Sequence, residues 1–263
     1  LRQQGFAPFI ELLRANLRPV GGLRVDHILG LKRLWLTRHG ASAADGVYLN
    51  YPFDDLLRLI RLEAWRQCAL MIGEDLGTVP EGLRQQLEDS GVLGMRVLWF
   101  ERDHSLFVEP QRWSANAVAT TTTHDLPTVA GWWQARDLEW RARAGQFSDG
   151  DGETQQREER AEDRVRLWSA LRYEGVTNLS EASQDASVQL NDAAIRFVAR
   201  TPSSLALIPM EDLLGVVEQP NVPGTTDAHP NWQQRLPVKV EALDDDAAVM
   251  ARTSDLQTER PRP

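Results

Sequence analysis

The sequence predicts an α/β fold, and two observations carry this prediction. Segments with apolar residues at helical spacing alternate along the chain with short apolar runs that contain many β-branched residues. These short runs are almost continuously apolar, which is typical of parallel strands covered by helices on both faces. Such alternation indicates either a doubly wound sheet or a barrel.

Five strands are expected from the apolar runs, at residues 22–26, 69–74, 94–100, 116–123 and 204–209. Helices are expected at 6–18, at 53–67, from Thr78 with Thr78 as its N-cap, and from Leu126. No helix is expected in the connection 101–115. An eight-stranded barrel needs three more strands, and the chain begins abruptly without Met, so we expect those strands upstream.

Two segments depart from this pattern. Residues 137–200 contain a polar loop and a charged helical segment, and we expect a mostly helical, mostly solvated insertion there. Residues 241–263 carry prolines and charges with little periodicity, which predicts a disordered tail. Residues 1–240 are therefore expected to form one α/β unit that contains the insertion.

Composition narrows the classes of function. The chain has 263 residues, a net charge of −9 and no dense block of Lys or Arg, so nucleic-acid binding is not expected. Its single cysteine, Cys68, allows no internal disulfide and suits a reducing compartment, which predicts a cytoplasmic location. No run of about 18 apolar residues occurs, so no membrane partner is expected. Nine tryptophans fit either core packing or stacking on a flat ligand such as a sugar ring.

Three carboxylates stand at the predicted strand ends. Asp26 ends the first strand, Glu74 the second and Asp125 the fourth. In a parallel α/β fold the carboxyl ends of the strands share one edge, where the following loops form a binding crevice. Carboxylates that are far apart in sequence are therefore expected to serve one site.

Each acid also has a structural alternative, because Asp at a strand-to-helix turn often caps the next helix. Asp125 is the most open to this alternative, since Leu126, Pro127 and Thr128 resemble a helix start. Three acids on three strand ends nevertheless favour a functional site over three separate caps. The five histidines show no metal-ligand spacing, so no metal is expected, and no phosphate-binding glycine loop is present.

The chemistry that uses such a set of carboxylates is glycoside cleavage. One carboxylate attacks the anomeric carbon, while a second, protonated, gives its proton to the leaving oxygen. Arg24 lies two residues before Asp26, so both side chains leave the same strand face and Arg24 favours the charged nucleophile. The apolar run 70–72 precedes Glu74, and an apolar setting favours a protonated acid.

Several motifs give the chain a specific resemblance. LRVDH at 23–27, GEDLG at 73–77 and TTTHD at 121–125 resemble three signature regions of the α-amylase clan. Together with YPFDDLLRLIRLEA from Tyr51 and NVPGTTDAHPNW from Asn221, the context is similar to the amylomaltases, the 4-α-glucanotransferases of glycoside hydrolase family 77. The similarity covers most of residues 6–236 and is weak in the insertion.

This resemblance implies a (β/α)8 barrel, of which the chain would be an N-terminally truncated, C-terminal catalytic part. It implies a retaining double displacement with Asp26 as nucleophile, Glu74 as general acid/base and Asp125 as the acid that binds donor-sugar hydroxyls. The implied substrates are maltooligosaccharides or other α-1,4-glucans. No cofactor is implied.

The resemblance also implies substrate contacts, which it assigns to Arg24, His27, His124, Asn221, Gly224 and Trp232. The chain departs from the family pattern at Ile28-Leu29, where many members have Phe-Arg, and at Gln233-Gln234, where arginine is common. Two alternatives to the transferase remain open, a hydrolase of the same clan and an inactive truncated fragment. The acids do not separate transfer from hydrolysis, because acceptor choice depends on loops and on water exclusion.

Overall fold

The computed structural model describes residues 2–147, 150–178 and 186–261 of the chain. Contacts between Cα atoms divide the chain into two compact units. Unit 1 comprises Leu1–Met95 with Asn116–Val118, and unit 2 comprises Arg96–Ala115 with Ala119–Pro263.

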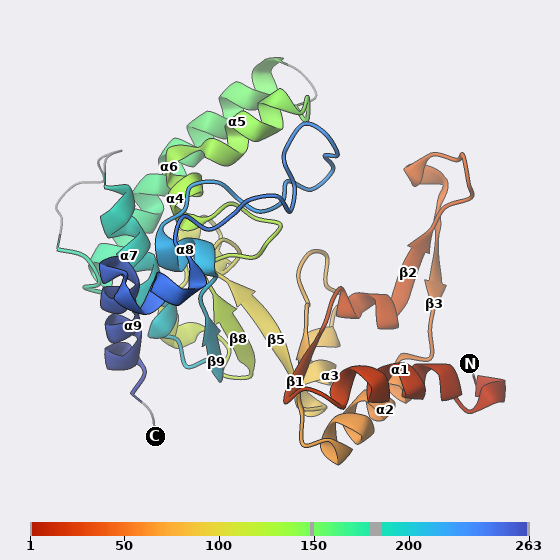
Figure 1. Cartoon of the computed structure of the whole chain (residues 1–263). Coiled ribbons are helices and arrows are strands. Elements are labelled where there is room, and N and C mark those ends of the chain that lie inside the picture. The colour runs from red at the N-terminus through yellow and green to blue at the C-terminus, as the bar shows by residue number, and fades with distance from the viewer. Residues whose placement is uncertain (1, 148–149, 179–185, 262–263) are drawn as a thin grey trace. The chain divides into compact units, whose positions relative to one another are not determined.

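The principal sheet has five parallel strands in the order β1-β4-β5-β8-β9 (Figure 1). Their bounds are Gly22–Val25 (β1), Leu70–Gly73 (β4), Val92–Val97 (β5), Ala117–Thr120 (β8) and Leu205–Leu207 (β9). The α/β class is confirmed, and each of the five predicted strands is present, although β5 begins and ends earlier than the predicted 94–100 and β8 ends earlier than the predicted 116–123. Strands β5 and β8 are buried at every residue, whereas β1 alternates between exposed and half-buried side chains.

Unit 1 builds its core from helices packed beside β1, β4 and β5. The helices are α1 (Ala7–Leu17), α2 (Phe53–Arg66) and α3 (Leu83–Asp89), with short 3-10 turns at Arg2–Gln4, Ile28–Leu31 (η2) and Ala43–Asp45. Helices α1 and α2 lie side by side and bury Leu13, Leu17 and Ile60 almost completely. This burial follows from the apolar stripe at helical spacing that predicted both helices.

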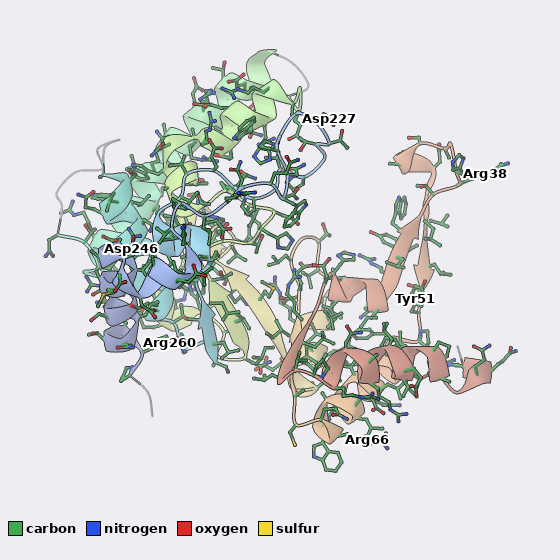
Figure 2. The ribbon with its side chains drawn as sticks, in the orientation of Figure 1. Arg38, Tyr51, Arg66, Asp227, Asp246 and Arg260 are labelled. Atoms are coloured by element: carbon green, nitrogen blue, oxygen red, sulfur yellow. The ribbon has the colours of Figure 1, made fainter. Side chains whose placement is uncertain are left out.

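Two features of unit 1 differ from the sequence expectation. Helix α3 begins at Leu83 and not near Thr78, because Gly82 adopts the left-handed region with φ of +74° and interrupts the helical path. A hairpin of β2 (Arg33–Leu36) and β3 (Val47–Asn50) is present that the sequence did not predict. Figure 2 labels Arg38 in the connection between these two strands.

Unit 2 contains six helices within its described residues, and they are α4 (Val129–Gln134), α5 (Arg136–Arg143), α6 (Gly150–Tyr173), α7 (Ser187–Ala199), α8 (Met210–Leu214) and α9 (Ala247–Glu259). A break at Ala135, which has φ of +60°, separates α4 from α5 where the sequence indicates one helix. The connection 101–115 holds a small hairpin of β6 (Arg102–Asp103) and β7 (Leu106–Phe107), followed by a 3-10 turn at Pro110–Arg112.

Within its described residues, the segment expected to be a mostly solvated insertion is mostly helical, but it is not mostly solvated. Helix α7 packs against α4 and α9 and buries eight of its thirteen residues, Phe197 and Leu190 completely. Helix α6 also buries Leu167 and Leu171 completely. The charged residues at the start of α6 dominate the sequence pattern, and they hide the apolar positions that follow.

The C-terminal segment differs most from its expectation of disorder. It forms a 3-10 turn at Val240–Asp245 and then α9, whose two ends are marked by Asp246 and Arg260 in Figure 2. Asp246 caps α9 by accepting hydrogen bonds from the N–H groups at positions 248 and 249. Glu259 accepts hydrogen bonds from Arg196 in α7 and from Arg200, the residue that follows that helix. Partners about 60 residues away along the chain therefore stabilise a helix with weak periodicity.

Candidate active site

Unit 1 places Asp26 and Glu74 at the ends of two paired strands. The register pairs Val25 with Gly73, so each acid directly follows the last residue of its strand. The Glu74 N–H donates to the Val25 carbonyl at 2.9 Å, and the Ile28 N–H donates to the Glu74 carbonyl at 3.0 Å. Backbone hydrogen bonding thus brings these two predicted acids together.

The side chains of Arg24 and Asp26 leave the same exposed face of β1, as the two-residue spacing predicts. Their ion pair has a length of 2.7 Å, and the Arg24 Nε also contacts the Met95 Sδ at 3.4 Å. The Asp26 side chain is 74% exposed, so its carboxylate is open to an incoming molecule. Neither group caps a helix, because the following 3-10 turn η2 begins after His27 and has no side-chain cap.

The setting of Glu74 is more polar than its sequence neighbours indicate. One carboxylate oxygen accepts the N–H of His27 at 2.7 Å, and the other accepts the N–H of Leu76 at 2.8 Å. The predicted apolar setting is therefore not what surrounds this half-buried carboxylate. The apolar run before Glu74 belongs to β4, which contributes Met71 to the core of unit 1, while the carboxylate lies beyond the strand end.

The residues beside the two acids hold their geometry. His27 adopts φ of +42°, a left-handed conformation that is uncommon for a non-glycine residue and often marks a functional loop. A Cβ on Gly73 would lie 2.5 Å from the Cδ1 of Ile28, so glycine lets η2 approach the end of β4. Asp75 is buried and accepts the N–H of Met95 at 2.7 Å, which ties the Glu74 loop to β5.

Unit 2 places Asp125 in a loop and not at a strand end. Strand β8 ends at Thr120, three residues before its predicted end. Hydrogen bonds from the threonine hydroxyls to main-chain carbonyls of the loop compete with the strand conformation here. Thr120 Oγ1, for example, donates to the Thr122 carbonyl at 2.8 Å. Thr128 is the N-cap of α4, accepting the N–H of Gly131, so Asp125 is not the cap of that helix.

The Asp125 carboxylate has two side-chain partners. Asn221 Nδ2 donates to one oxygen at 2.6 Å, and His124 Nε2 lies 3.4 Å from the other. The ring of Trp232 lies 5.4 Å from the His124 ring, tilted by 43°, and its side chain is largely exposed. Unit 2 thereby brings together four of the predicted site residues.

The loop that carries Asn221 and Trp232 is held by its own polar contacts. The Asn231 side chain accepts the N–H of Val222 at 2.9 Å and donates to the Thr225 carbonyl at 3.0 Å. Gly224 lies between these two bonded positions, and its φ of +77° provides the turn that a residue with a Cβ would adopt only with strain. Asn231 was not among the predicted site residues, although the motif that contains it was recognised.

Two cavities flank the His124–Asp125 pair within unit 2. The first has a volume of about 350 Å³, and Asp125, Trp99, Trp132, Asp137, Arg160 and Gln219 contribute to its lining. The second has a volume of about 340 Å³ and is lined by residues that include His124, Trp232, Thr122 and Glu211. Both volumes lie at the lower end of the range of small-ligand pockets.

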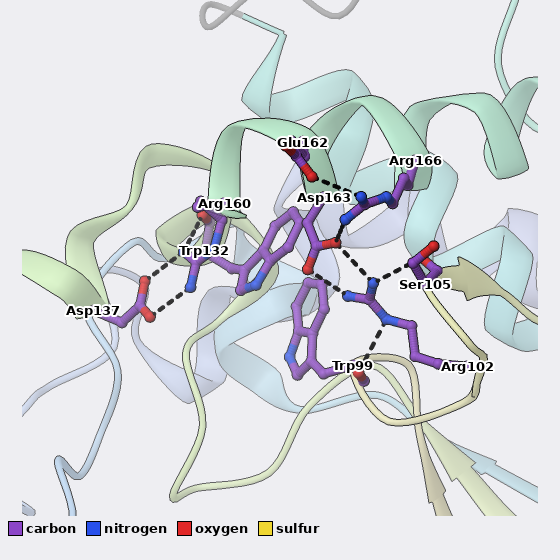
Figure 3. A network of polar contacts seen from close by, with 9 residues as sticks. All are labelled: Trp99, Arg102, Ser105, Trp132, Asp137, Arg160, Glu162, Asp163 and Arg166. Atoms are coloured by element: carbon purple, nitrogen blue, oxygen red, sulfur yellow. Dashed lines mark hydrogen bonds and ion pairs between the residues drawn. The ribbon is translucent and has the colours of Figure 1, made fainter. Parts of the chain in front are cut away.

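Figure 3 shows how the wall of the first cavity is stiffened. The rings of Trp99 and Trp132 stack with centroids 4.6 Å apart, and the Arg160 guanidinium lies 4.6 Å from the Trp132 ring centroid. Arg160 also binds both carboxylate oxygens of Asp137 at 2.8 Å. These contacts hold the two rings and the guanidinium against one another in the wall of the cavity.

A second bidentate ion pair lies beside this wall (Figure 3). Arg102 binds both carboxylate oxygens of Asp163, at 3.0 and 2.9 Å. Burial alone would raise the pKa of Asp163, but hydrogen bonds from Arg102 and Arg166 outweigh it and lower that pKa. Asp163 is therefore held in its charged form.

The described residues contain no group of three or more His, Cys, Asp or Glu side chains that could hold a metal ion. None of the described helices combines the length and the apolar character that a bilayer crossing requires.

Comparison with known proteins identifies the family of this chain. The model of glycoside hydrolase family 77, described as 4-alpha-glucanotransferase, matches residues 1–240. The chain belongs to the 4-alpha-glucanotransferase family. This membership confirms the resemblance found in the sequence motifs.

The 4-alpha-glucanotransferase of Haemophilus influenzae is 37% identical over 244 residues, which are 90% of this chain and 34% of that protein. The 4-alpha-glucanotransferase of Mycobacterium bovis is 36% identical over 241 residues, 90% of this chain and 33% of that protein. The chain thus spans about a third of the length of the curated relatives it matches.

Solved structures place the fold within the amylomaltase barrel. The crystal structure of amylomaltase from Corynebacterium glutamicum matches with a TM-score of 0.89 and 30% identity, over 96% of this chain and 38% of that chain. The amylomaltase from Streptococcus agalactiae, solved in complex with acarbose, matches with a TM-score of 0.70 over 99% of this chain and 45% of that chain. At 20% identity the second match speaks for the fold alone. The five strands correspond to part of the family's TIM barrel.

The roles of the individual site residues remain predictions. Among the lining residues, sequence analysis missed Trp99, Trp132 and Arg160. The abundance of tryptophan left core packing and ligand stacking open, and Trp99 and Trp132 are both largely buried while lining a cavity. Arg160 lies in the charged segment that was interpreted as a solvated insertion.

Proposed function

We propose that the protein containing this chain transfers α-1,4-glucan segments between maltooligosaccharides by a retaining double displacement. The observation that carries this proposal is the pair Asp26 and Glu74 at the register-matched ends of β1 and β4, with Arg24 bound to Asp26. Family membership supports the reaction class. The acarbose complex of the Streptococcus agalactiae amylomaltase supports an α-glucan as the class of substrate.

In the first half-reaction, an Asp26 carboxylate oxygen attacks the anomeric carbon of the donor glucan. The glycosidic C–O bond breaks, its electron pair stays on the leaving oxygen, and Glu74 donates the proton that this oxygen takes up. The product is a glycosyl ester on Asp26 and a shortened glucan. Arg24 balances the charge of Asp26 before the attack, because their ion pair is 2.7 Å long.

In the second half-reaction, the 4-hydroxyl of an acceptor sugar attacks the same anomeric carbon. Glu74, now a carboxylate, takes the hydroxyl proton, and Asp26 leaves with the electron pair of the ester bond. The product is a lengthened glucan, and both acids return to their starting forms.

The remaining predicted site residues bind sugar in this proposal. Asp125, oriented by Asn221 and His124, binds donor-sugar hydroxyls during both steps. His27 and the exposed ring of Trp232 offer further contacts to sugar. Gly224 shapes the loop that carries Asn221.

The test is disproportionation of maltotriose by the natural protein that contains this chain, carrying Asp26→Asn. We expect kcat to fall by about 10⁴-fold or more, because an amide is no nucleophile and catalytic groups of this kind act as a unit. Asp45→Asn, an exposed acid of the same unit, is the matched control and should keep parental activity. Activity close to the parent for Asp26→Asn would remove Asp26 as nucleophile.

Product analysis in the same assay separates transfer from hydrolysis. Oligosaccharides longer than maltotriose are expected from a transferase, whereas a hydrolase releases shorter sugars only. Residues 1–263 expressed alone are expected to be poorly stable and inactive, since open sheet edges and apolar faces would be exposed. A cooperative thermal transition with full transferase activity for that chain would contradict this expectation.

A further inference from the structure

One buried carboxylate bonds to both ends of the loop that carries His124 and Asp125. Asp212, on α8, has no exposed surface. Its Oδ2 accepts a hydrogen bond from the Thr121 hydroxyl, just after β8, and its Oδ1 accepts the N–H of Val129, the first residue of α4, at 2.7 Å. A single side chain therefore closes the loop 121–129 at its base.

The interior of this loop is also bonded to itself and to its surroundings. Thr122 Oγ1 donates to the Pro127 carbonyl at 2.8 Å, and Thr128 Oγ1 donates to the Val217 carbonyl at 3.1 Å. A Cβ on Gly131 would overlap the Val217 carbonyl oxygen, so α4 and residue 217 are in close contact. With both ends and the interior held, the two residues at the loop tip have little freedom of placement.

Asp212 is itself held by two other helices of unit 2. Its carbonyl accepts a hydrogen bond from the Asn191 side chain of α7 at 2.6 Å. Arg252 of α9 donates to the next carbonyl, that of Leu213, at 2.6 Å, and to Asp192 at 2.7 Å. Helices α7 and α9 thus hold α8 in place, and the Asp212 carboxylate on α8 holds the loop 121–129.

Keeping a carboxylate in this place is costly. Complete burial is the largest effect and raises the pKa of Asp212 from 3.8 to about 6, against the hydrogen bonds from Thr121 and Val129, which lower it. The charge of Glu211 raises this pKa and that of Arg252 lowers it. An apolar residue at this position would avoid the cost of desolvation. We therefore expect the Asp212 carboxylate to have a role that outweighs this loss of stability.

We propose that Asp212 is a positioning residue, which closes the loop 121–129 at both ends and thereby sets Asp125 in place for the donor sugar. The inference rests on the proposed function, because it assigns Asp125 to sugar binding. Asp212 itself does not touch the substrate. It affects activity indirectly, by accepting the hydrogen bonds from the Thr121 hydroxyl and the Val129 N–H that hold the loop.

Two substitutions distinguish a role of Asp212 in positioning Asp125 from a general role in folding stability. Both are made in the natural protein. Asp212→Asn keeps an oxygen for the Val129 N–H and a donor for Thr121 Oγ1, so we expect kcat within about threefold of the parent. Asp212→Leu loses both bonds, and we expect kcat to fall about 100-fold, the size of effect that a displacement of about 1 Å produces. KM should change less than kcat, because Asp125 acts most strongly in the transition state.

Leu171→Ala is the control for general destabilisation, since Leu171 is completely buried in α6 of the same unit. It should lower the melting temperature and leave kcat unchanged at temperatures where the protein is folded. If Leu171→Ala reduces kcat as much as Asp212→Leu, the effect is one of stability and the proposal is overturned. If Asp212→Leu does not fold, Thr121→Val removes one end of the closure and should reduce kcat about tenfold, and parental kcat in that variant would overturn the proposal.

Amide hydrogen exchange at Val129 gives a readout that does not depend on activity. Asp212→Leu should accelerate this exchange about tenfold to a hundredfold, and Asp212→Asn should stay close to the parent. Unchanged exchange and unchanged kcat in Asp212→Leu would overturn the proposal. If the parent shows no transfer but the exchange responds as expected, the role in holding the loop stands and the proposed function fails.

Discussion

The two units place their acids by different physical means. In unit 1, Asp26 and Glu74 follow two strands whose last residues, Val25 and Gly73, are paired in the sheet. Backbone hydrogen bonds between these strands bring the two acids together. In unit 2, Asp125 lies five residues beyond the end of β8, and side chains from separate segments set its position. Strand register is sufficient for the first pair, whereas the second arrangement needs Asn221 and Asp212.

This difference predicts where substitutions act. Around Asp26 and Glu74, most supporting contacts are made by main-chain groups, which a point substitution does not remove, so the acids themselves are the sensitive positions. Around Asp125, the support comes from side chains, so activity should respond to residues that never meet the sugar. Three substitutions test this contrast, and the first has the largest expected effect.

Glu74→Gln should reduce maltotriose disproportionation by about 10²–10⁴-fold, the usual contribution of a general acid/base. The glutamine oxygen still accepts one of the two N–H bonds, but the other N–H then faces the glutamine NH2 group, so the melting temperature is measured beside the activity. A donor whose leaving group needs no proton, such as a maltosyl fluoride, should restore the first half-reaction in Glu74→Gln but not in Asp26→Asn. Glu81→Gln, an exposed acid near α3, is the control.

The result against this assignment would be equal loss with both donors, because then Glu74 does not supply the proton. Equal recovery of Asp26→Asn with the fluoride would count against the division of roles between the two acids. Either outcome would contradict the proposal that the bond-breaking and proton-transfer steps are carried out by the two acids of unit 1.

The pH dependence of stability should differ between the parent and Asp212→Asn. Because the pKa of Asp212 is raised to about 6, the folded protein binds its proton more tightly than the unfolded chain does. The free energy of unfolding should therefore fall as pH rises from about 4 to about 6, by up to about 3 kcal/mol at about 1.4 kcal/mol per pKa unit. Asp212→Asn should lack this component in urea unfolding measured across that range.

The difference between the two proteins is the quantity to compare, because other carboxylates contribute with the opposite sign. The pKa values of Asp163 and Glu259 are lowered, the latter mainly by a hydrogen bond from Arg200, and their stabilisation is lost as pH falls. Parallel pH curves for the parent and Asp212→Asn would mean that Asp212 is charged equally in the folded and unfolded states.

Asn221→Ala should have the smallest of these effects, a loss of about tenfold in kcat/KM. It removes the 2.6 Å hydrogen bond to Asp125, and a bond to a charged group contributes about 1.5–3 kcal/mol. We expect the low end of this range because the Asp125 side chain is 49% exposed and water can replace the amide. Asp227→Asn in the same loop is the control. If Asn221→Ala loses more activity than Asp212→Leu, Asn221 and not Asp212 is the main support of Asp125.

The expectations that succeeded share a local physical cause. Helices α1 and α2 and the strands β1 and β4 are encoded by apolar periodicity within single segments, so their positions follow from the sequence. The common face of Arg24 and Asp26 follows from the two-residue period of a strand. The family follows from motifs that are contiguous along the chain.

The expectations that differed from the structure depend on contacts between distant residues. Four threonines in a row predict a longer β8, but their hydroxyls bond within the loop and to Asp212. The C-terminal segment has weak periodicity, yet it is helical because Glu259 binds Arg196 and Arg200. Neither outcome could be predicted from a single segment, because Asp212 lies about 90 residues from Thr121, and Glu259 lies about 60 residues from its two arginine partners.

The α/β class, the family, and the placement of Asp26 and Glu74 at the ends of two strands follow from the sequence alone. These properties depend on periodicity and on short motifs, which are local. Three others required the folded chain: Asp125 lies in a loop closed by Asp212, Glu74 sits among N–H donors, and stacked tryptophans line a cavity. They arise from packing and hydrogen bonding between segments, whose partners no local pattern specifies.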